Sequence, residues 1–585
     1  MMNKSAILHI PQSQYAFAGS ETAITIRLRT AAGDLTCCTL YYGDRACNKS
    51  PVEFFPLPMS LAAGDDLFDY YEITFEPPFN RVCYYFKLEK EEEWIYYYSD
   101  QFSRELPDFV LKGVVIEGRS EYFQYPVILR DEIPDVPDWF KNAVVYNIFP
   151  DSFASGRRRI DNQEKQITLA DGLISKSRLG GTIKGILENL DYIADLGFTC
   201  IYLNPIFTAG EYHKYDLLDY YHIDPCLGSD EDFKELVGKI HERNMHIIID
   251  GVFNHCSWYF FAFEDVVKYG EESEYKDWFY DLKFPVVRPG EGELPSYACF
   301  AYERKMPKLN TSNKKVQEYF INVCKHWIRE YKVDGWRLDV ANEIDRNFWR
   351  AFRQAAKEEN PNTVLIGEVW ENAETWLRGD AFDSTMNYDF RRHCRDFFAM
   401  ERTDAYQFAG RIDRMRLRYP ANITLGQLNL LDSHDVSRFL SLCGEDIGKW
   451  KLACIFLLLC PGVPSIFYGD EKQISGITEA QYRSPMPWQN ENGEIESFVK
   501  RIIEIRKSHT DVKSDYQVLR AEQGSRVLVF LRKRSAKTLM VCINAGEQEA
   551  LTEIPAVKQV LMEEGALKGP EHLTLMPRGF GIYLV

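Results

Sequence analysis

An arginine and an aspartate stand two residues apart in one apolar run of the chain, residues 333–340. Arg337 and Asp339 would lie on the same face of a β-strand, because side chains alternate between its two faces. Inside a buried strand a carboxylate needs a partner, and a guanidinium beside it lowers its pKa and keeps it ionised. Such a sheltered carboxylate can act as a nucleophile. An isolated pair of this kind is equally typical of a structural ion pair, so the choice depends on the rest of the chain.

Further polar residues stand at the ends of other short apolar runs. Asp250 ends one run, Glu368 lies near the end of a second and Asp435 follows a third. The carboxyl ends of parallel barrel strands meet at one mouth, so Asp339, Glu368 and Asp435 are predicted to converge. Cleavage of an acetal needs one group that donates a proton and another that captures or stabilises an oxocarbenium-like centre. Two carboxylates suffice for that chemistry, and a third could orient the substrate.

The elements that must position these residues alternate between strand-like and helical patterns. Seven apolar runs are predicted strands: 143–149, 200–207, 246–253, 333–340, 363–369, 428–431 and 464–468. Segments between them repeat apolar residues at helical spacing, as in 313–331. Seven or eight such units indicate a (β/α)8 TIM barrel, which we assign to residues 131–255 and 313–509. The long aromatic stretch 256–312 after the third strand is predicted to be an inserted subdomain.

β-Domains are predicted on both sides of the barrel. In residues 1–130 apolar and polar residues alternate with period two between turn-forming residues, which is typical of an antiparallel β-sandwich. Alternating runs return at 527–531, 539–543 and 580–585, so residues 510–585 are predicted to form an antiparallel β-domain. The predicted fold class is therefore multidomain.

The composition bounds the possible partners. The 585 residues carry a formal net charge of −18 with a pI near 5.3 and no lysine- or arginine-rich tract, so no nucleic-acid partner is expected. The longest apolar run, 452–460, is too short to span a bilayer, and His9 and Pro11 interrupt a leader-like start. The 14 cysteines form no C-x-x-C pair. We expect a cytoplasmic protein with reduced thiols and no membrane partner.

These segments, in this order and in a barrel, resemble the conserved regions of the α-amylase family of glycoside hydrolases, family 13. Residues 306–310, Met-Pro-Lys-Leu-Asn, resemble the branch that contains cyclomaltodextrinase, neopullulanase and maltogenic amylase, and so do residues 340–343, Val-Ala-Asn-Glu. A β-sandwich before the barrel, which helps to form a dimer, is also the layout of that branch. The resemblance covers nearly the whole chain.

The resemblance implies a role for each polar residue. Asp339 is expected to be the nucleophile of a retaining mechanism, Glu368 the general acid/base and Asp435 the carboxylate that binds the distorted sugar ring. Further expected substrate-binding residues are Arg337, His255, His434, His213, Tyr215, Trp370, Glu343, Glu479 and Arg483. For Tyr215 and Trp370 the alternative is ordinary packing in the core. For the two histidines beside the catalytic strand ends, the position favours sugar binding over packing.

Two segments depart from the family. Many relatives bind calcium through an Asn/Asp-rich loop after the first strand, where this chain has Arg157, Arg158 and Arg159, followed by Gly-Gly-Thr at 180–182. Calcium prefers anionic and carbonyl oxygens, so we expect no metal and no other cofactor. In the amino-terminal module Ala46 stands where relatives carry an aromatic residue that reaches the partner subunit. A homodimer is still implied by the resemblance.

The function implied by the resemblance is retaining hydrolysis of α-1,4-glucosidic bonds in cyclodextrins and maltooligosaccharides, with pullulan as a further candidate and with some transglycosylation. Two other functions stay open. A non-catalytic sugar-binding barrel would usually have lost one of the three carboxylates, which this chain keeps. An enzyme of the same fold that acts on α-1,6 bonds, sucrose or trehalose would keep all three, and loop lengths alone do not distinguish it.

Overall fold

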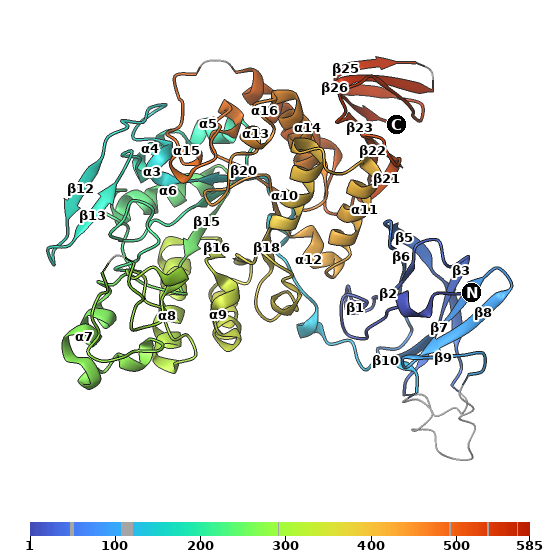
Figure 1. Cartoon of the computed structure of the whole chain (residues 1–585), viewed down its shortest axis with the longest axis horizontal. Coiled ribbons are helices and arrows are strands. Elements are labelled where there is room, and N and C mark those ends of the chain that lie inside the picture. Colours follow the sequence, from blue (N-terminus) through green and yellow to red (C-terminus); the bar gives the residue numbers. More distant parts are fainter. Residues whose placement is uncertain (47–51, 107–120, 291, 491–492, 535–536, 570) are drawn as a thin grey trace. The chain divides into compact units, whose positions relative to one another are not determined.

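The structure is a computed structural model that describes residues 1–46, 52–106, 121–290, 292–490, 493–534, 537–569 and 571–585 (Figure 1). The chain divides into two compact units. The first comprises Met1–Asp135, Thr403–Thr424 and Ala521–Ser525, and the second comprises Val136–Arg402, Leu425–Arg520 and Arg526–Val585. All the predicted site residues belong to the second unit.

The second unit contains a closed barrel of eight parallel strands, which confirms the predicted TIM barrel. Its strands are, in order, β11 (Val145–Ile148), β14 (Cys200–Leu203), β15 (His246–Gly251), β16 (Gly335–Leu338), β17 (Val364–Gly367), β18 (Ser384–Asn387), β19 (Leu428–Leu430) and β20 (Val463–Phe467). The last strand, β20, pairs with β11 and closes the barrel. Almost every strand residue is buried, as expected for a parallel sheet covered on both faces.

Helices alternate with these strands along the chain. Those of the second unit include α2 (Asp138–Lys141), α3 (Pro150–Phe153), α4 (Ile183–Glu188), α5 (Leu190–Asp195), α6 (Asp230–Glu242), α7 (Phe261–Tyr269), α8 (Lys314–Tyr331), α9 (Arg346–Glu359), α10 (Tyr388–Cys394), α13 (Phe439–Leu442), α14 (Ile447–Leu459), α15 (Glu479–Tyr482) and α16 (Glu494–His509). Helix α8 shows how the sequence sets their bounds. Asn313 caps its amino end, Phe320 and Trp327 bury one face, and Lys332 ends it in the left-handed conformation.

The sixth barrel strand, β18, has no counterpart among the predicted apolar runs. Its residues, Ser-Thr-Met-Asn, include only one apolar side chain. The Thr385 hydroxyl donates to Gln427 Oε1 at 2.7 Å, and Asn387 Nδ2 donates to Asn429 Oδ1 at 2.8 Å. Because polar side chains of this strand are satisfied by hydrogen bonds to neighbouring residues, its hydrophobic pattern does not reveal it.

The first unit contains two antiparallel sheets, which confirm the predicted β-sandwich. One has the order β1 (Ala16–Ala18), β2 (Ile24–Ala31), β6 (Phe68–Phe75), β5 (Ser60–Gly64), and the other has the order β4 (Phe55–Pro58), β3 (Cys37–Asp44), β7 (Val82–Lys90), β8 (Glu93–Tyr98), β9 (Gln101–Ser103), with β10 (Phe123–Tyr125) paired to β7. Ile26 and Leu28 of the first sheet share one core with Leu40 and Phe86 of the second. Helix α11 (Ala405–Arg416) belongs to this unit, in which α12 (Ala421–Leu425) begins.

An antiparallel sheet follows the barrel, as predicted. Its order is β21 (Asp515–Ala521), β22 (Val527–Arg534), β23 (Lys537–Asn544), β26 (His572–Leu584), β24 (Ala550–Glu553), with β25 (Gln559–Lys568) paired to β26. A small hairpin, β12 (Lys165–Thr168) and β13 (Ile174–Ser177), lies between α3 and α4 in the sequence. Among the described helices, none combines the length and the apolar character needed to cross a membrane.

Candidate active site

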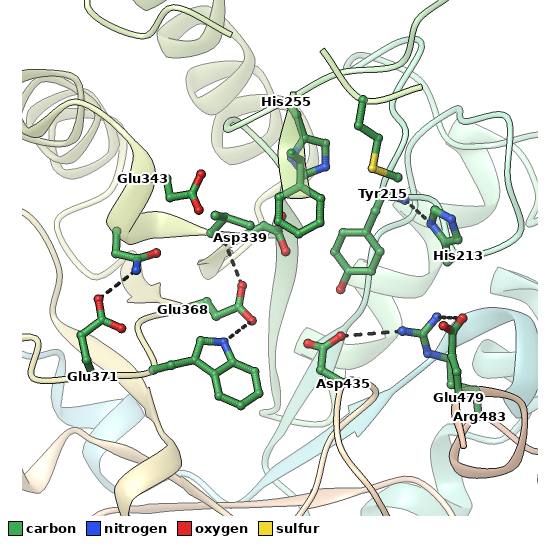
Figure 2. Close-up of a pocket in the computed structure, with 15 residues that line it drawn as sticks. His213, Tyr215, His255, Asp339, Glu343, Glu368, Glu371, Asp435, Glu479 and Arg483 are labelled. Carbon is green, nitrogen blue, oxygen red and sulfur yellow. Dashed lines mark hydrogen bonds and ion pairs between the residues drawn. The ribbon is translucent and has the colours of Figure 1, made fainter. Parts of the chain in front are cut away.

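The barrel brings the predicted carboxylates to the carboxyl ends of its strands. Asp250 in β15 pairs in register with Arg337 in β16. Asp339 directly follows β16, Glu368 directly follows β17, and Asp435 stands in the loop after β19. Figure 2 shows Asp339, Glu368 and Asp435 facing a common space. The side chains that could cleave an acetal therefore lie together.

Arg337 lies fully buried among these carboxylates. Its Nη1 donates to Asp250 Oδ1 at 2.9 Å and to Asp339 Oδ1 at 2.7 Å. Its Nη2 lies 2.9 Å from Glu368 Oε1 and 3.7 Å from Asp435 Oδ2. One guanidinium is thus shared by four carboxylates, whereas the sequence predicted it as the partner of Asp339. The cluster carries an excess of negative charge.

The pKa values of two of these carboxylates are shifted in opposite directions. Burial raises the pKa of the Asp339 carboxyl well above its ordinary value, and the neighbouring carboxylates add to the rise while Arg337 opposes it. At Asp435 the effect of burial is outweighed by His434 and two arginines, so the pKa of that carboxyl lies well below its ordinary value. The lowering that Arg337 exerts on the pKa of Asp339, which the sequence predicted, is outweighed by burial and by the neighbouring carboxylates. The site therefore holds a proton more readily near Asp339 than at Asp435.

Glu368 is held from two sides. The backbone amide of Val340 donates to its Oε2 at 2.9 Å, and Trp370 Nε1 donates to its Oε1 at 3.1 Å. Val340 adopts φ 44° and ψ 43°, a left-handed conformation that a β-branched residue rarely takes. Backbone strain of this kind concentrates at functional sites. The strained turn after Asp339 thus aims an amide at the candidate general acid/base.

His434 connects Asp435 to the wall of the site. The side-chain amide of Asn204 donates to His434 Nδ1 at 2.8 Å, so the Nε2 hydrogen is left for Asp435 Oδ2, 3.0 Å away. The Tyr215 hydroxyl also contacts His434 Nε2 and donates to Asp250 Oδ2 at 3.0 Å. These contacts fix both rings, and they keep the Asp435 carboxylate in one orientation.

His255 and His213 also line the site, and both are held neutral. Burial lowers the pKa of His255 to about 3 and that of His213 to about 4, because a charged imidazole is poorly solvated there. The His255 ring stacks on Phe300 with ring centroids 4.8 Å apart. Within the described residues His255 Nε2 has no hydrogen-bond partner. A buried polar atom without a partner beside a pocket suits contact with a ligand hydroxyl.

The site opens into a pocket of about 580 Å³. The predicted residues that line it are Asp339, Glu368, Asp435, His213, Tyr215, His255, Glu343, Trp370, Glu479 and Arg483. Arg337 and His434, by contrast, are fully buried and stand behind the lining. The structure therefore brings all twelve predicted residues to one place, ten at the surface of the pocket and two in its support.

The rim of the pocket combines an aromatic face with paired charges. Trp370 is 43% exposed, and its ring stacks on Tyr388 with ring centroids 3.7 Å apart. Arg483 Nη1 donates to Glu479 Oε1 at 2.7 Å, and Arg483 Nε donates to a backbone carbonyl at 2.8 Å. Glu343 pairs with Lys308 at 3.1 Å. Flat apolar faces beside hydrogen-bonding groups are well suited to a sugar ring.

Two families of protein domains match the chain. The family described as "Alpha amylase, catalytic domain" matches residues 147–524, and the family described as "Alpha amylase, N-terminal ig-like domain" matches residues 1–128. The chain belongs to the α-amylase family. As a member of this family it is a glycoside hydrolase, and the resemblance found in the sequence is confirmed.

Relatives of the expected branch resemble this α-amylase family chain along its whole length. A cyclomaltodextrinase of Geobacillus thermopakistaniensis is 37% identical over 596 aligned residues, which cover 100% of each chain. Neopullulanase 2 of Thermoactinomyces vulgaris is 38% identical over 592 aligned residues, which cover 98% of each chain. A solved structure named cyclomaltodextrinase superposes with a TM-score of 0.90 and 33% identity, and the match covers 99% of each chain.

The calcium loop of many family members has no suitable donor set here. Arg159 pairs with Asp161 at 3.2 Å, and the Arg158 guanidinium lies over the ring of Tyr192. The carboxylate of Asp151 accepts hydrogen bonds from Ser177 and from the backbone amides of residues 178–180. In the described part of the chain, no three His, Cys, Asp or Glu side chains are grouped closely enough to hold a metal ion. These residues do not fit a calcium site.

Sequence reasoning missed several residues of the site. Asp250 was seen at a strand end but was not given a role, although it binds Arg337 and accepts from Tyr215. Tyr388 supports Trp370 from the end of β18, the strand that the hydrophobic pattern does not show. Phe300, between α7 and α8 in the sequence, stacks on His255 and lines the pocket. The position of Asp250 at a strand end was a usable signal for the first of these, whereas the other two have no local motif.

Proposed function

We propose that this protein hydrolyses α-1,4-glucosidic bonds in cyclodextrins and maltooligosaccharides, with pullulan as a further substrate and with some transfer of glycosyl groups to other sugars. The observation that carries the proposal is the convergence of Asp339, Glu368 and Asp435 on one pocket around Arg337. A non-catalytic sugar-binding protein would not need all three carboxylates in a strained, charge-rich cluster. The relatives named cyclomaltodextrinase and neopullulanase 2 support the substrate class.

In the proposed reaction Asp339 is the nucleophile and Glu368 the acid and base. The Asp339 carboxylate attacks the anomeric carbon, the bond from that carbon to the glycosidic oxygen breaks, and Glu368 gives its proton to the leaving oxygen. Water then attacks the same carbon, Glu368 takes a proton from it, and the ester bond to Asp339 breaks. Two displacements retain the α-configuration. A sugar hydroxyl in place of water gives transglycosylation.

The position of one proton decides whether this reaction can start. The carboxylate cluster favours retention of a proton, because burial and an excess of negative charge raise the pKa of the Asp339 carboxyl. A glycosidic oxygen beside Glu368 accepts a hydrogen bond only from a protonated acid, so substrate binding draws the proton to Glu368 and leaves Asp339 ionised beside Arg337. The Val340 amide and Trp370 Nε1 keep Glu368 oriented for the transfer.

The other residues are proposed to hold the sugar chain. Asp435 stays ionised and can accept hydrogen bonds from sugar hydroxyls, while the partnerless Nε2 of His255 contacts another hydroxyl. The ring of Tyr215 faces the sugar at the cleavage site, and Trp370 offers a platform on the acceptor side. Glu343 is proposed to position the acceptor sugar or the water. Arg337 and His434 hold the carboxylates of the pocket from behind its lining. His213, Glu479 and Arg483 line the donor side.

We further propose that the enzyme works as a homodimer in the cytoplasm, without calcium or another cofactor. The amino-terminal β-sandwich supports dimer formation by its likeness to the family, although the loop at Ala46 continues into residues outside the described ranges. Cys200, Cys256 and Cys454 are free, buried thiols, which suits a reducing compartment. The donor set after β11 supports the absence of calcium. Analytical ultracentrifugation tests the dimer, and a monomer at micromolar concentration contradicts it.

Product profiles from β-cyclodextrin, pullulan and soluble starch test the proposed function. We expect faster turnover of β-cyclodextrin than of starch, and loss of all three activities in Glu368→Gln. Full activity in that variant contradicts the mechanism. A strong preference for starch over cyclodextrin contradicts the proposed substrate class.

A further inference from the structure

A second pocket lies at the amino-terminal ends of the barrel strands, away from the carboxyl ends that carry the active site. It has a volume of about 260 Å³ and includes residues that precede β11, β19 and β20. The charged residues that line it are Lys141, Arg506, Lys507, Asp511, Arg532 and Arg534, and we call it the cationic pocket. Five positive side chains and one negative side chain meet there in a protein whose formal net charge is −18.

Arg506, on α16, is buried without a carboxylate partner. Its side chain is 8% exposed. Its Nη1 donates to the carbonyls of Leu458 at 2.6 Å and Cys460 at 3.2 Å, and its Nη2 donates to the carbonyl of Gly462 at 2.6 Å. Among the described residues no carboxylate lies within 4.0 Å of this guanidinium. These bonds use three of its five N–H groups, and its charge is not neutralised.

Arg532, on β22, brings a second buried guanidinium to the same pocket. It is 2% exposed, and its Nη1 donates to the carbonyl of Leu459 at 2.7 Å while its Nη2 donates to the carbonyl of Asp511 at 3.2 Å. Burial and the charge of Arg532 lower the pKa of Arg506 to about 9. The repulsion from Arg532 adds to the cost of burying Arg506 without a carboxylate.

The helix end beneath the two arginines offsets only part of this charge. The carbonyls of Leu458 and Leu459 belong to the last turn of α14, where the helix dipole supplies about half a negative charge. Asp511 is already paired with Arg534 at 2.7 Å, and Lys141 is paired with Asp138 at 2.6 Å. Lys507 adds a further cation, and no carboxylate of the described chain lies within 4.0 Å of it. An excess of positive charge faces the pocket.

We infer that the cationic pocket binds a phosphate group, either of inorganic phosphate or of a phosphorylated small molecule. Phosphate carries more than one negative charge near neutral pH, and its oxygens accept several hydrogen bonds at once, as a group of guanidinium and ammonium donors requires. Because the pocket is built from segments far apart in the sequence, its ligand would bind the folded state alone and stabilise it. The alternative is a purely structural role, in which the two arginines only cap the carboxyl end of α14.

Binding can be measured on the full chain with two probes, inorganic phosphate and glucose 6-phosphate, at constant ionic strength kept with sodium chloride. We expect a saturable rise in Tm and saturable heats in calorimetry. Lys507→Glu, at an exposed position of α16, should weaken binding by about ten-fold or more, because a carboxylate on the pocket wall repels the ligand. Lys507→Arg should keep the affinity. Lys315→Glu, the same charge change at an exposed site on α8, is the matched control and should bind as the parent does.

Each outcome has one meaning. Saturation by both probes supports free phosphate as sufficient, and saturation by glucose 6-phosphate alone supports a phosphorylated small molecule. A response that never saturates, or one that Lys507→Glu and Lys315→Glu change equally, means a general salt effect and overturns the inference. Hydrolysis of β-cyclodextrin is measured beside each variant, and it should stay unchanged because Lys507 lies outside the active site.

Discussion

The two ends of the barrel strands carry an excess of charge of opposite sign. At the carboxyl ends one buried guanidinium, Arg337, serves four carboxylates. At the amino ends two buried guanidiniums, Arg506 and Arg532, donate to backbone carbonyls, and the carboxylate in their pocket is paired with Arg534. The same fold thus leaves one end short of positive charge and the other short of negative charge.

This contrast shows what each end can bind. A cluster with excess negative charge stabilises the positive charge that develops on a sugar ring as its glycosidic bond breaks. A pocket with excess positive charge stabilises an anion that is already formed. The carboxyl end therefore favours a transition state, and the amino end favours a ground-state ligand. The predictions below test this contrast from its largest consequence to its smallest.

Asp339→Asn should abolish hydrolysis, with a fall in kcat of about 10⁴-fold or more, because no other carboxylate can form the covalent intermediate. Thermal stability should stay the same or rise, since the change removes one negative charge from a cluster that has too many. Initial rates on β-cyclodextrin and a thermal melt measure both. A loss of activity that comes with a collapse of Tm would show a structural role instead.

Glu368→Gln should lower kcat on β-cyclodextrin by about 10²–10⁴-fold, because proton donation to the leaving oxygen is lost. Glu371→Gln is the matched control. Glu371 lines the same pocket and accepts from Asn342 at 2.8 Å, but it lies outside the Arg337 cluster, so its variant should stay within a few-fold of the parent. Equal losses in the two variants would contradict the assignment of Glu368.

Replacing the two arginines compares the two ends directly. Arg337→Met should lower the free energy of unfolding by about 3–5 kcal/mol, because it leaves buried carboxylates without their cation. Arg506→Met should cost less, about 1–3 kcal/mol in phosphate-free buffer, because it leaves only carbonyls unpaired. Urea denaturation followed by tryptophan fluorescence measures both. A larger cost for Arg506→Met would reverse the contrast.

Low pH should destabilise the active-site end through its neutral histidines. In the unfolded chain a histidine takes up a proton near pH 6.5, whereas folded His255 and His213 do so only at about 3 and about 4. Between about pH 4 and pH 6.5 the unfolded state binds more protons than the folded state. The contribution of the two histidines to the free energy of unfolding is therefore complete above about pH 6.5 and is lost as the pH decreases toward 4.

The contribution of His255 to this pH dependence can be measured by itself. His255→Gln should reduce the slope of stability against pH between 4 and 6 by about one proton, or about 1.4 kcal/mol per pH unit. Urea midpoints at several pH values measure the slope. An unchanged slope in the variant would mean that His255 is protonated in the folded state.

Removal of divalent metal should have the smallest effect. Because Arg158 and Arg159 occupy the loop after β11 and do not fit a calcium site, EDTA should leave Tm unchanged. The same thermal melt with added phosphate should show a rise in Tm, so one method compares the effects of calcium and phosphate. A clear fall in Tm with EDTA, reversed by calcium, would contradict the proposed absence of the metal.

The sequence predicted the parts of the active site that follow apolar strands. Asp339 and Glu368 directly follow buried runs, and their order along the chain is enough to place them at one mouth. The prediction failed at β18, because its polar residues are satisfied by partners that only the folded barrel supplies. It also assigned Arg337 to one carboxylate, since a linear spacing shows one neighbour and not the three that arrive from other strands.

The cationic pocket could not be predicted in this way. Lys141, Arg506 and Arg532 are separated by hundreds of residues or lie on different kinds of element, and none belongs to a motif. Their juxtaposition arises only when the end of α14, the helix α16 and strand β22 pack together. Charge patterns that depend on packing are visible in the structure alone.

The anomeric form of the first product tests the central claim most directly. Proton NMR of a maltooligosaccharide or β-cyclodextrin digest, recorded within the first minutes and before mutarotation, distinguishes the α- from the β-anomer of the new reducing end. The account predicts that the α-anomer appears first, because Asp339 and Glu368 act in two successive displacements. First appearance of the β-anomer, or no new reducing end at all, would contradict it.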